Sequence, residues 1–231
     1  MTVLTARAVL FDMDGTLVDS TPVVEHAWGR FADRHSIDVA EILESSHGRT
    51  ANETVRRWAP PGTDVDAELA LLLEMELGLV EGIVEIPGAA AFARAVPRWA
   101  LVTSAPRSLA AARLEIVGIE VPAALVGAED VTRGKPDPQP YLRGAEALGV
   151  DPADVIVFED AEAGVRSALA AGMRTVVVGP LDTAVTGGLP RIPDFRGARV
   201  RPATPDGDAD ADTADAAAAD AGHRFDIVLG A

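Results

Sequence analysis

The stretch FDMDGTLVDS, residues 11–20, decides how the rest of the chain is interpreted. It follows the short apolar run RAVLF, residues 7–11, which is typical of a strand buried on both faces. In an extended chain Asp12 and Asp14 would lie on one face, and Gly15 indicates that the chain turns directly after them. Two carboxylates this close together repel each other unless a cation lies between them. The stretch therefore predicts a strand that ends at a cation site.

Further along the chain, apolar runs alternate with segments of helical length. Three runs have the composition of buried strands and a fourth is weaker; they are ALVTS from Ala100, VIVFED from Val155, TVVVG from Thr175 and the weaker AALVG from Ala123. The helical segments between them are 88–96, 106–117, 138–148 and 162–171. This alternation predicts an α/β fold with a Rossmann-like, doubly wound parallel sheet that is covered by helices on both faces.

Residues 20–81 interrupt this alternation and contain no strand candidate. One set of apolar residues at helical spacing is Val24, Ala27, Trp28 and Phe31. A second stripe with one polar exception, its last member, is Leu69, Leu72, Leu73 and Glu76. We therefore expect a small all-helical cap domain, inserted after the first strand, with hinges near Ser20 and Gly82.

These patterns divide the chain into a core, an insert and a tail. We expect the α/β core to comprise residues 1–19 and 82–202, and the helical cap to comprise residues 20–81. Residues 203–222 contain six aspartates and no lysine or arginine, and this alanine- and aspartate-rich composition predicts a disordered acidic tail. The last segment, 223–231, ends in RFDIVLG, which is either a small edge strand or an unstructured end.

The overall composition excludes several classes of function. The formal net charge is −16, which disfavours binding to nucleic acid and to anionic membranes. The chain has no cysteine, so disulfides, thiolate metal sites and a cysteine nucleophile are excluded. No leader and no apolar run of membrane-spanning length is present in the sequence. We expect a cytoplasmic protein that is a monomer or a weak homodimer.

Polar residues end several of the predicted strands. Ligands of open α/β sheets bind outside the carboxyl ends of the strands, so these residues are predicted to meet at one edge of the sheet. They are Asp12, Asp14, Thr103, Ser104, Glu159 and Asp160, together with Lys135 from the loop RGKPDP. Each alone has an ordinary explanation, such as a turn or a capped helix, and the inference depends on their convergence.

The residue types in this group suggest phosphoryl chemistry. Four carboxyl groups without a thiol or a histidine suit a hard cation that prefers oxygen, and Mg²⁺ is the ordinary candidate. Mg²⁺, a lysine and hydroxyl and backbone donors together can receive a phosphoryl group. One carboxylate could attack phosphorus to give an aspartyl-phosphate, and a second carboxyl group could protonate the leaving oxygen and then activate water.

The motifs FDMDGTLVDS, LVTSAPR, GKPDP and VFEDAEAG, in this order, resemble the haloacid dehalogenase superfamily of phosphohydrolases, in its branch with a helical cap. The resemblance covers about residues 7–180. It implies that Asp12 is the nucleophile and a Mg²⁺ ligand, and that Asp14 is the general acid/base with its backbone carbonyl on the metal. It further implies phosphate binding by Thr103, Ser104 and Lys135, and completion of the metal site by Glu159 and Asp160.

Within this superfamily the chain looks most like small sugar-phosphate or polyol-phosphate phosphatases, such as those acting on 2-deoxyglucose 6-phosphate or glycerol phosphate. The stretch SHGRTANETVRRW, residues 46–58, resembles their cap segment, so His47 and Arg49 are expected to contact substrate. The alternative for this pair is a solvated loop, and we expect Arg56 and Arg57 on a solvated helix face.

Two relatives within the superfamily are excluded and two alternatives remain. Dehalogenases lack an aspartate at the position of Asp14, and phosphonate-cleaving members need a cap lysine, whereas residues 20–81 contain none. A phosphosugar mutase of the β-phosphoglucomutase type would share the same core, although the cap lacks lysines for a second phosphate. A non-catalytic binding protein is the other alternative, but such proteins usually lose one of the chemical groups.

Overall fold

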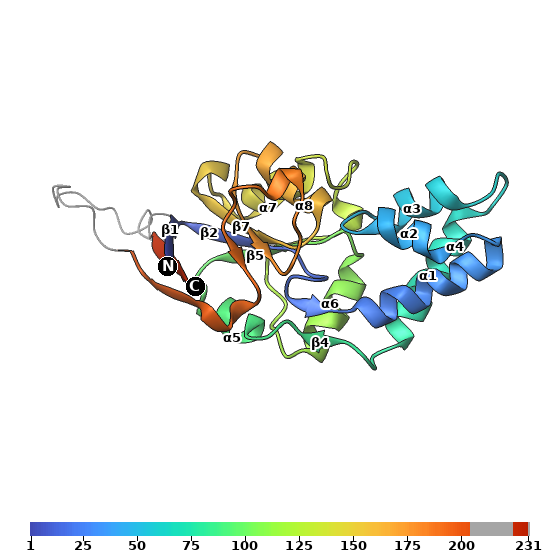
Figure 1. Ribbon diagram of the computed structural model, residues 1–231, viewed down its shortest axis with the longest axis horizontal. Helices are drawn as coiled ribbons and strands as arrows, with labels where there is room; N and C mark the ends of the chain where they lie inside the picture. The colour runs from blue at the N-terminus through green and yellow to red at the C-terminus, as the bar shows by residue number, and fades with distance from the viewer. Residues whose placement is uncertain (204–223, 231) are drawn as a thin grey trace.

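The structure is a computed structural model that describes residues 1–203 and 224–230. It consists of an α/β core with a group of four helices at one end (Figure 1). The predicted fold class is therefore confirmed. The tail predicted to be disordered, 203–222, lies outside the described residues except for Ala203. No helix in the described ranges is both long and apolar enough to cross a membrane.

The core is built on a six-stranded sheet in which every pair of neighbouring strands is parallel. The strand order is β6-β5-β2-β7-β8-β9. The strands are β2 (Ala8–Phe11), β5 (Trp99–Val102), β6 (Leu125–Val126), β7 (Val155–Glu159), β8 (Arg174–Val178) and β9 (Arg191–Ile192). The chain runs outward from β2 in one direction and then outward from β7 in the other. The switch point therefore lies between β2 and β7, where ligands of such sheets bind.

Helices cover both faces of this sheet. They are α5 (Ala89–Ala95), α6 (Arg107–Ile116), α7 (Gln139–Leu148) and α8 (Glu162–Ala170). Alternate residues of β2 point to opposite faces, so Phe11 packs on the α5 and α6 side and Leu10 packs on the α7 and α8 side. Phe11 stacks on Phe158 with ring centroids 5.4 Å apart, which joins β2 to β7 just below their carboxyl ends.

The four remaining helices lie in the segment predicted as a cap, which the structure describes throughout and which contains no strand. They are α1 (Thr21–His35), α2 (Val39–Ser46), α3 (Ala51–Trp58) and α4 (Val65–Gly78). They enclose an apolar cluster of their own, which includes Trp28, Phe31, Ile42, Val55 and Leu72. This separate cluster supports the proposal that residues 20–81 form a cap domain.

The two connections between the core and the cap helices lie side by side. β3 (Val18–Asp19) pairs antiparallel with β4 (Val84–Glu85), next to the positions Ser20 and Gly82 that were predicted as hinges.

The chain ends form a second, antiparallel sheet at the end of the core away from the cap helices (Figure 1). Its strands, in spatial order, are β1 (Thr2–Ala6), β11 (Phe225–Leu229) and β10 (Ala198–Pro202). The terminal segment is therefore a strand, one of the two alternatives expected for it, but it is the middle strand of three and not an edge strand. Its two partners, β1 and β10, lie in segments that were not predicted as strands.

Candidate active site

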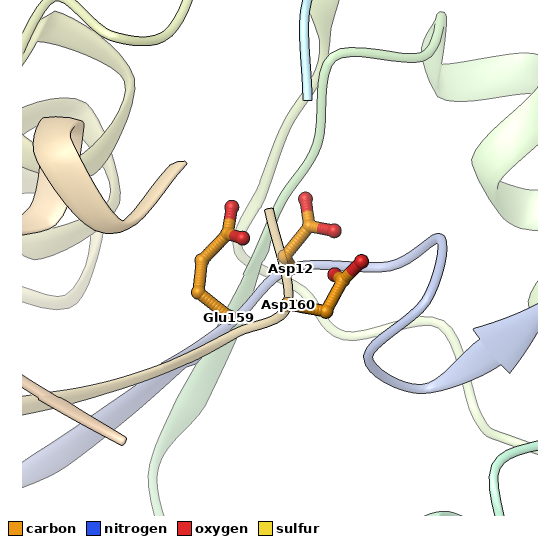
Figure 2. A group of neighbouring side chains, drawn as sticks. All are labelled: Asp12, Glu159 and Asp160. Carbon is orange, nitrogen blue, oxygen red and sulfur yellow. The ribbon is translucent and has the colours of Figure 1, made fainter. Parts of the chain in front are cut away.

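Three carboxylates meet at the switch point of the sheet. Asp12 directly follows β2, Glu159 ends β7, and Asp160 directly follows it. Each offers one oxygen, and these oxygens lie within 4.8 Å of one another (Figure 2). The backbone N–H of Asp12 donates to the carbonyl of Phe158 at 3.1 Å, which keeps the two strand ends in register.

The turn after Asp12 is shaped to fit Asp160. Gly15 has a φ of +87°, and a Cβ at this position would lie 2.0 Å from Oδ2 of Asp160. Thr16 donates its hydroxyl hydrogen to Oδ1 of Asp160 at 2.9 Å. The glycine and threonine of the opening motif are therefore explained by a carboxylate that lies 144 positions away from Thr16 in the chain.

Lys135 forms ion pairs with two of these carboxylates. Its Nζ donates to Oδ1 of Asp12 at 2.5 Å and to Oε1 of Glu159 at 2.7 Å, and its side chain is 1% exposed. Glu159 accepts two more hydrogen bonds, from the hydroxyl of Tyr141 to Oε1 at 3.1 Å and from the backbone N–H of Ala161 to Oε2 at 2.8 Å. Both oxygens of Glu159 are thus occupied by donors of this chain.

The site holds more negative charge than Lys135 can balance. Burial raises the pKa of Asp12 to about 7, with Glu159 adding to the effect and Lys135 opposing it. Burial, and then the charges of Glu159 and Asp12, raise the pKa of Asp160 well above its usual range. Burial would lower the pKa of Lys135, but the two carboxylates outweigh it and raise the pKa above its ordinary value. A cation next to these oxygens would relieve the repulsion, and an all-oxygen donor set fits a hard divalent metal ion.

Asp14 has different partners from Asp12. Its Oδ1 accepts hydrogen bonds from the hydroxyl of Ser20 at 2.6 Å and from Nη1 of Arg113 at 2.7 Å. Nη2 of Arg113 donates to Oε2 of Glu76 in α4 at 2.6 Å. The carboxylate of Asp14 therefore belongs to a second cluster, with Ser20 and Arg113, and not to the group of three carboxylates.

Sequence reasoning missed Arg113 and Tyr141. Tyr141 lies on the apolar face of α7, so the sequence pattern marks it as a core residue and not as a hydrogen-bond donor to the site. A signal for Arg113 existed, because Glu76 is the polar exception in the apolar stripe of α4.

The predicted phosphate-binding residues of β5 lie at the same edge of the sheet. Thr103 is 4% exposed, and its Oγ1 accepts a hydrogen bond from the backbone N–H of Ala105 at 3.1 Å. Ser104 donates its hydroxyl hydrogen to the carbonyl of Gly48 at 2.8 Å, which joins the core to the loop between α2 and α3.

A cavity of about 210 Å³ lies between this edge and the cap helices. Its lining includes Asp12, Asp14, Thr103, Ser104 and Asp160 from the core. His47 and Arg49 line it from the cap, with exposed side chains. Arg56 and Arg57 are exposed on α3, as expected for a solvated helix face.

The chain is similar in sequence to a family of hydrolases and to several phosphatases. The sequence model of the haloacid dehalogenase-like hydrolases matches residues 6–172. Hexitol phosphatase A of Escherichia coli is 43% identical over 184 residues, which cover 77% of this chain and 85% of that protein. Glycerol-1-phosphate phosphohydrolase 2 of Saccharomyces cerevisiae is 34% identical over 186 residues, which cover 75% of this chain and 74% of that protein.

Solved structures resemble the fold as well. A β-phosphoglucomutase of Clostridium difficile superimposes with a TM-score of 0.73 at 23% identity, over 82% of this chain and 91% of that chain. At this identity the likeness shows the fold alone.

Proposed function

Because the chain belongs to the haloacid dehalogenase-like hydrolases, we propose that it hydrolyses a small sugar phosphate or polyol phosphate in a Mg²⁺-dependent reaction. The family predicted from the four sequence motifs is confirmed by the match to residues 6–172. The observation that carries the proposal is the arrangement of Asp12, at the wall of the cavity, against the buried ammonium group of Lys135.

Asp12 is the nucleophile in this proposal. Lys135 binds its Oδ1, and no described residue donates a hydrogen bond to its Oδ2. Oδ2 forms the bond to phosphorus while the bond from phosphorus to the substrate oxygen breaks, which gives an aspartyl-phosphate. Asp14 gives its proton to the leaving oxygen, so that a neutral alcohol departs.

The same two aspartates act in the second step. Asp14 takes a proton from water as the water oxygen attacks phosphorus, and the bond between phosphorus and Asp12 breaks to release inorganic phosphate. Lys135, the hydroxyl of Thr103 and the backbone N–H of Ser104 are proposed to hold the phosphoryl oxygens during both steps.

Asp12, Asp160 and the backbone carbonyl of Asp14 are proposed to hold Mg²⁺, with the charge of Glu159 next to them. When bound, Mg²⁺ supplies positive charge that offsets the negative charge of the phosphoryl oxygens. The hydrogen bonds of Glu159 suit it to hold Lys135 in place, since both of its oxygens already accept donors of this chain.

The preference for sugar or polyol phosphates is supported by the named phosphatase relatives. His47 and Arg49 are proposed to contact the part of the substrate beyond phosphorus. The mutase alternative has weaker support, because the mutase likeness is structural, at 23% identity, whereas the two relatives named above at 43% and 34% identity are phosphatases. Incubation with β-glucose 1-phosphate separates the two, since a phosphatase releases free phosphate and a mutase forms glucose 6-phosphate.

The test of the proposal is the variant Asp12→Asn, measured by the release of free phosphate from glycerol 1-phosphate and from hexitol phosphates with Mg²⁺. We expect activity to fall by at least about 10³-fold, because the amide cannot form the intermediate. The same loss should follow removal of the metal with EDTA and should be reversed by added Mg²⁺. Asp33→Asn, the same change at an exposed position of α1, is the control and should keep full activity. Phosphate release by Asp12→Asn at the parent rate would disprove the assignment.

A further inference from the structure

Arg113 is a buried cation that the proposed mechanism does not use. It lies in α6 with 2% of its side chain exposed, and its two terminal nitrogens bind carboxylates from different parts of the molecule. One is Asp14, at 2.7 Å in the loop after β2, and the other is Glu76, at 2.6 Å in α4 of the cap. The guanidinium group therefore links the proposed acid/base residue to the cap.

The ion pairs of Arg113 with Asp14 and Glu76 are not explained by a contribution to the stability of the fold alone. A buried guanidinium group loses its hydration, and Nε of Arg113 is buried without a hydrogen-bond partner. Buried ion pairs of this kind can often be replaced by apolar residues without loss of stability. An apolar residue at position 76 would also complete the stripe formed by Leu69, Leu72 and Leu73. We therefore look for a functional role for the carboxylate of Glu76 in α4.

The link fixes one oxygen of Asp14 and leaves the other available. Ser20 and Arg113 both donate to Oδ1. No described residue donates a hydrogen bond to Oδ2, and the side chain of Asp14 is 31% exposed where it lines the cavity. Oδ2 is thus the oxygen that can exchange a proton with a substrate or with water. The direction in which Oδ2 points depends on the hydrogen bonds of Ser20 and Arg113, which fix the position of Oδ1.

Glu76 in turn holds Arg113. Monodentate contact with Asp14 alone would let the guanidinium group rotate, whereas a second hydrogen bond from Nη2 fixes its plane. This second contact exists only while α4 lies against α6. We propose that Arg113 is a positioning residue for Asp14 and that Glu76 completes the arrangement from the cap, so that the acid/base group is correctly oriented only when the cap is closed.

This inference rests on the proposed function, in which Asp14 protonates the leaving oxygen. It is tested with p-nitrophenyl phosphate and phenyl phosphate, which are similar in shape but differ in their leaving groups. The p-nitrophenolate ion leaves readily without a proton, whereas phenolate needs one. A misplaced general acid therefore slows the hydrolysis of phenyl phosphate selectively.

We expect Glu76→Gln and Arg113→Lys to lower kcat/KM, which reports the step in which the leaving group departs, by 10-fold or more for phenyl phosphate, on the scale of general acid catalysis, and by less than about threefold for p-nitrophenyl phosphate. KM for both substrates should change little, because neither residue is assigned to phosphate binding. Glu74→Gln is the matched control, an exposed glutamate of the same helix, and should change neither rate. Circular dichroism and the Tm of each variant, measured with Mg²⁺, check that it folds.

A double variant separates this inference from the proposed function. In the background Asp14→Asn, Glu76→Gln should cause no further selective loss, because it acts through Asp14. Equal losses of kcat/KM for both substrates in Glu76→Gln, or a further selective loss of kcat/KM in the double variant, would overturn the positioning role. If Asp14→Asn itself hydrolyses phenyl phosphate at the parent rate, the acid/base assignment of the proposed function fails instead.

Discussion

Two glycines of this site are required because carboxylates occupy the space where their side chains would be. At Gly15 the clash would be with Asp160, and the positive φ adds strain for any other residue. At Gly164, in the first half of α8, a Cβ would lie 1.5 Å from Oε1 of Glu159. Glu159 cannot move without disturbing Lys135, which depends on it for one of its two ion pairs.

We predict that Gly164→Ala lowers phosphatase activity by about 10²-fold, since displacement of a positioned group by about 1 Å has effects of this size. The overpacking should also lower the free energy of unfolding by about 1–3 kcal/mol. The measurements are kcat with saturating Mg²⁺ and urea denaturation.

Gly29→Ala is the matched control for this prediction. Gly29 lies in α1 and a Cβ there would have no atom within 4 Å, so the change should leave activity unaltered and stabilise the helix by up to about 1 kcal/mol. Full activity in Gly164→Ala would show that the position of Glu159 is not critical.

At the scale of helices and strands, an element could be predicted when the pattern that marks it lies within its own residues, and not when it depends on a partner distant in the sequence. The strands of the parallel sheet are continuous apolar runs because both of their faces are buried, and five of the six, including the weaker run at β6, were predicted from this property alone. β1 and β10 carry threonines and arginines, and their common partner β11 is distant from both in the sequence, so no local pattern marks them. Arg113 was missed for the same reason, because its partners lie 99 and 37 positions away.

The cap helices contain an ion pair network that should make their stability depend on pH. Glu68 in α4 accepts hydrogen bonds from Arg34 at 2.6 Å and from His35 at 3.0 Å, which joins α4 to α1. Burial alone would raise the pKa of Glu68, but these hydrogen bonds outweigh it and hold the pKa below its usual value of 4.5. The ionised form is thus more favourable in the folded cap than in the unfolded chain.

The sign of the pH effect follows from this lowered pKa. The contribution of Glu68 is fully present above pH 4.5, its unfolded pKa, and is lost as the pH falls through the lower folded pKa. We predict that Glu68→Gln lowers the free energy of unfolding by about 1–3 kcal/mol at pH 6, and that the difference from the parent shrinks below pH 4.5. Denaturation followed by helix circular dichroism at several pH values measures this, with Glu74→Gln as the control that should show no difference. A deficit that stays constant down to pH 3 would contradict the assigned cause.

At the scale of the whole molecule, the candidate active site and the antiparallel sheet of the chain ends lie at opposite ends of the core. The reactive groups gather where the sheet meets the cap helices, and the chain ends meet in the antiparallel sheet at the other end of the core (Figure 1). β11 is the middle strand of that sheet, and its inward side chains join the same apolar cluster as Phe11 and Phe158. The last strand of the chain therefore completes the core without touching the site.

This separation predicts a change that affects stability without affecting catalysis. Ile227 in β11 is fully buried, whereas its neighbour Val228 is only half-buried because alternate residues of a strand face opposite sides. We predict that Ile227→Ala lowers the free energy of unfolding by about 2–5 kcal/mol, since it leaves a cavity in the core, and that Val228→Ala lowers it by no more than about 1 kcal/mol. Both variants, assayed at a temperature where they are folded, should keep the kcat of the parent. Equal losses of stability would mean that the two faces of β11 are not distinguished by the core, and a large fall in kcat for Ile227→Ala would mean that the terminal sheet is coupled to the active site.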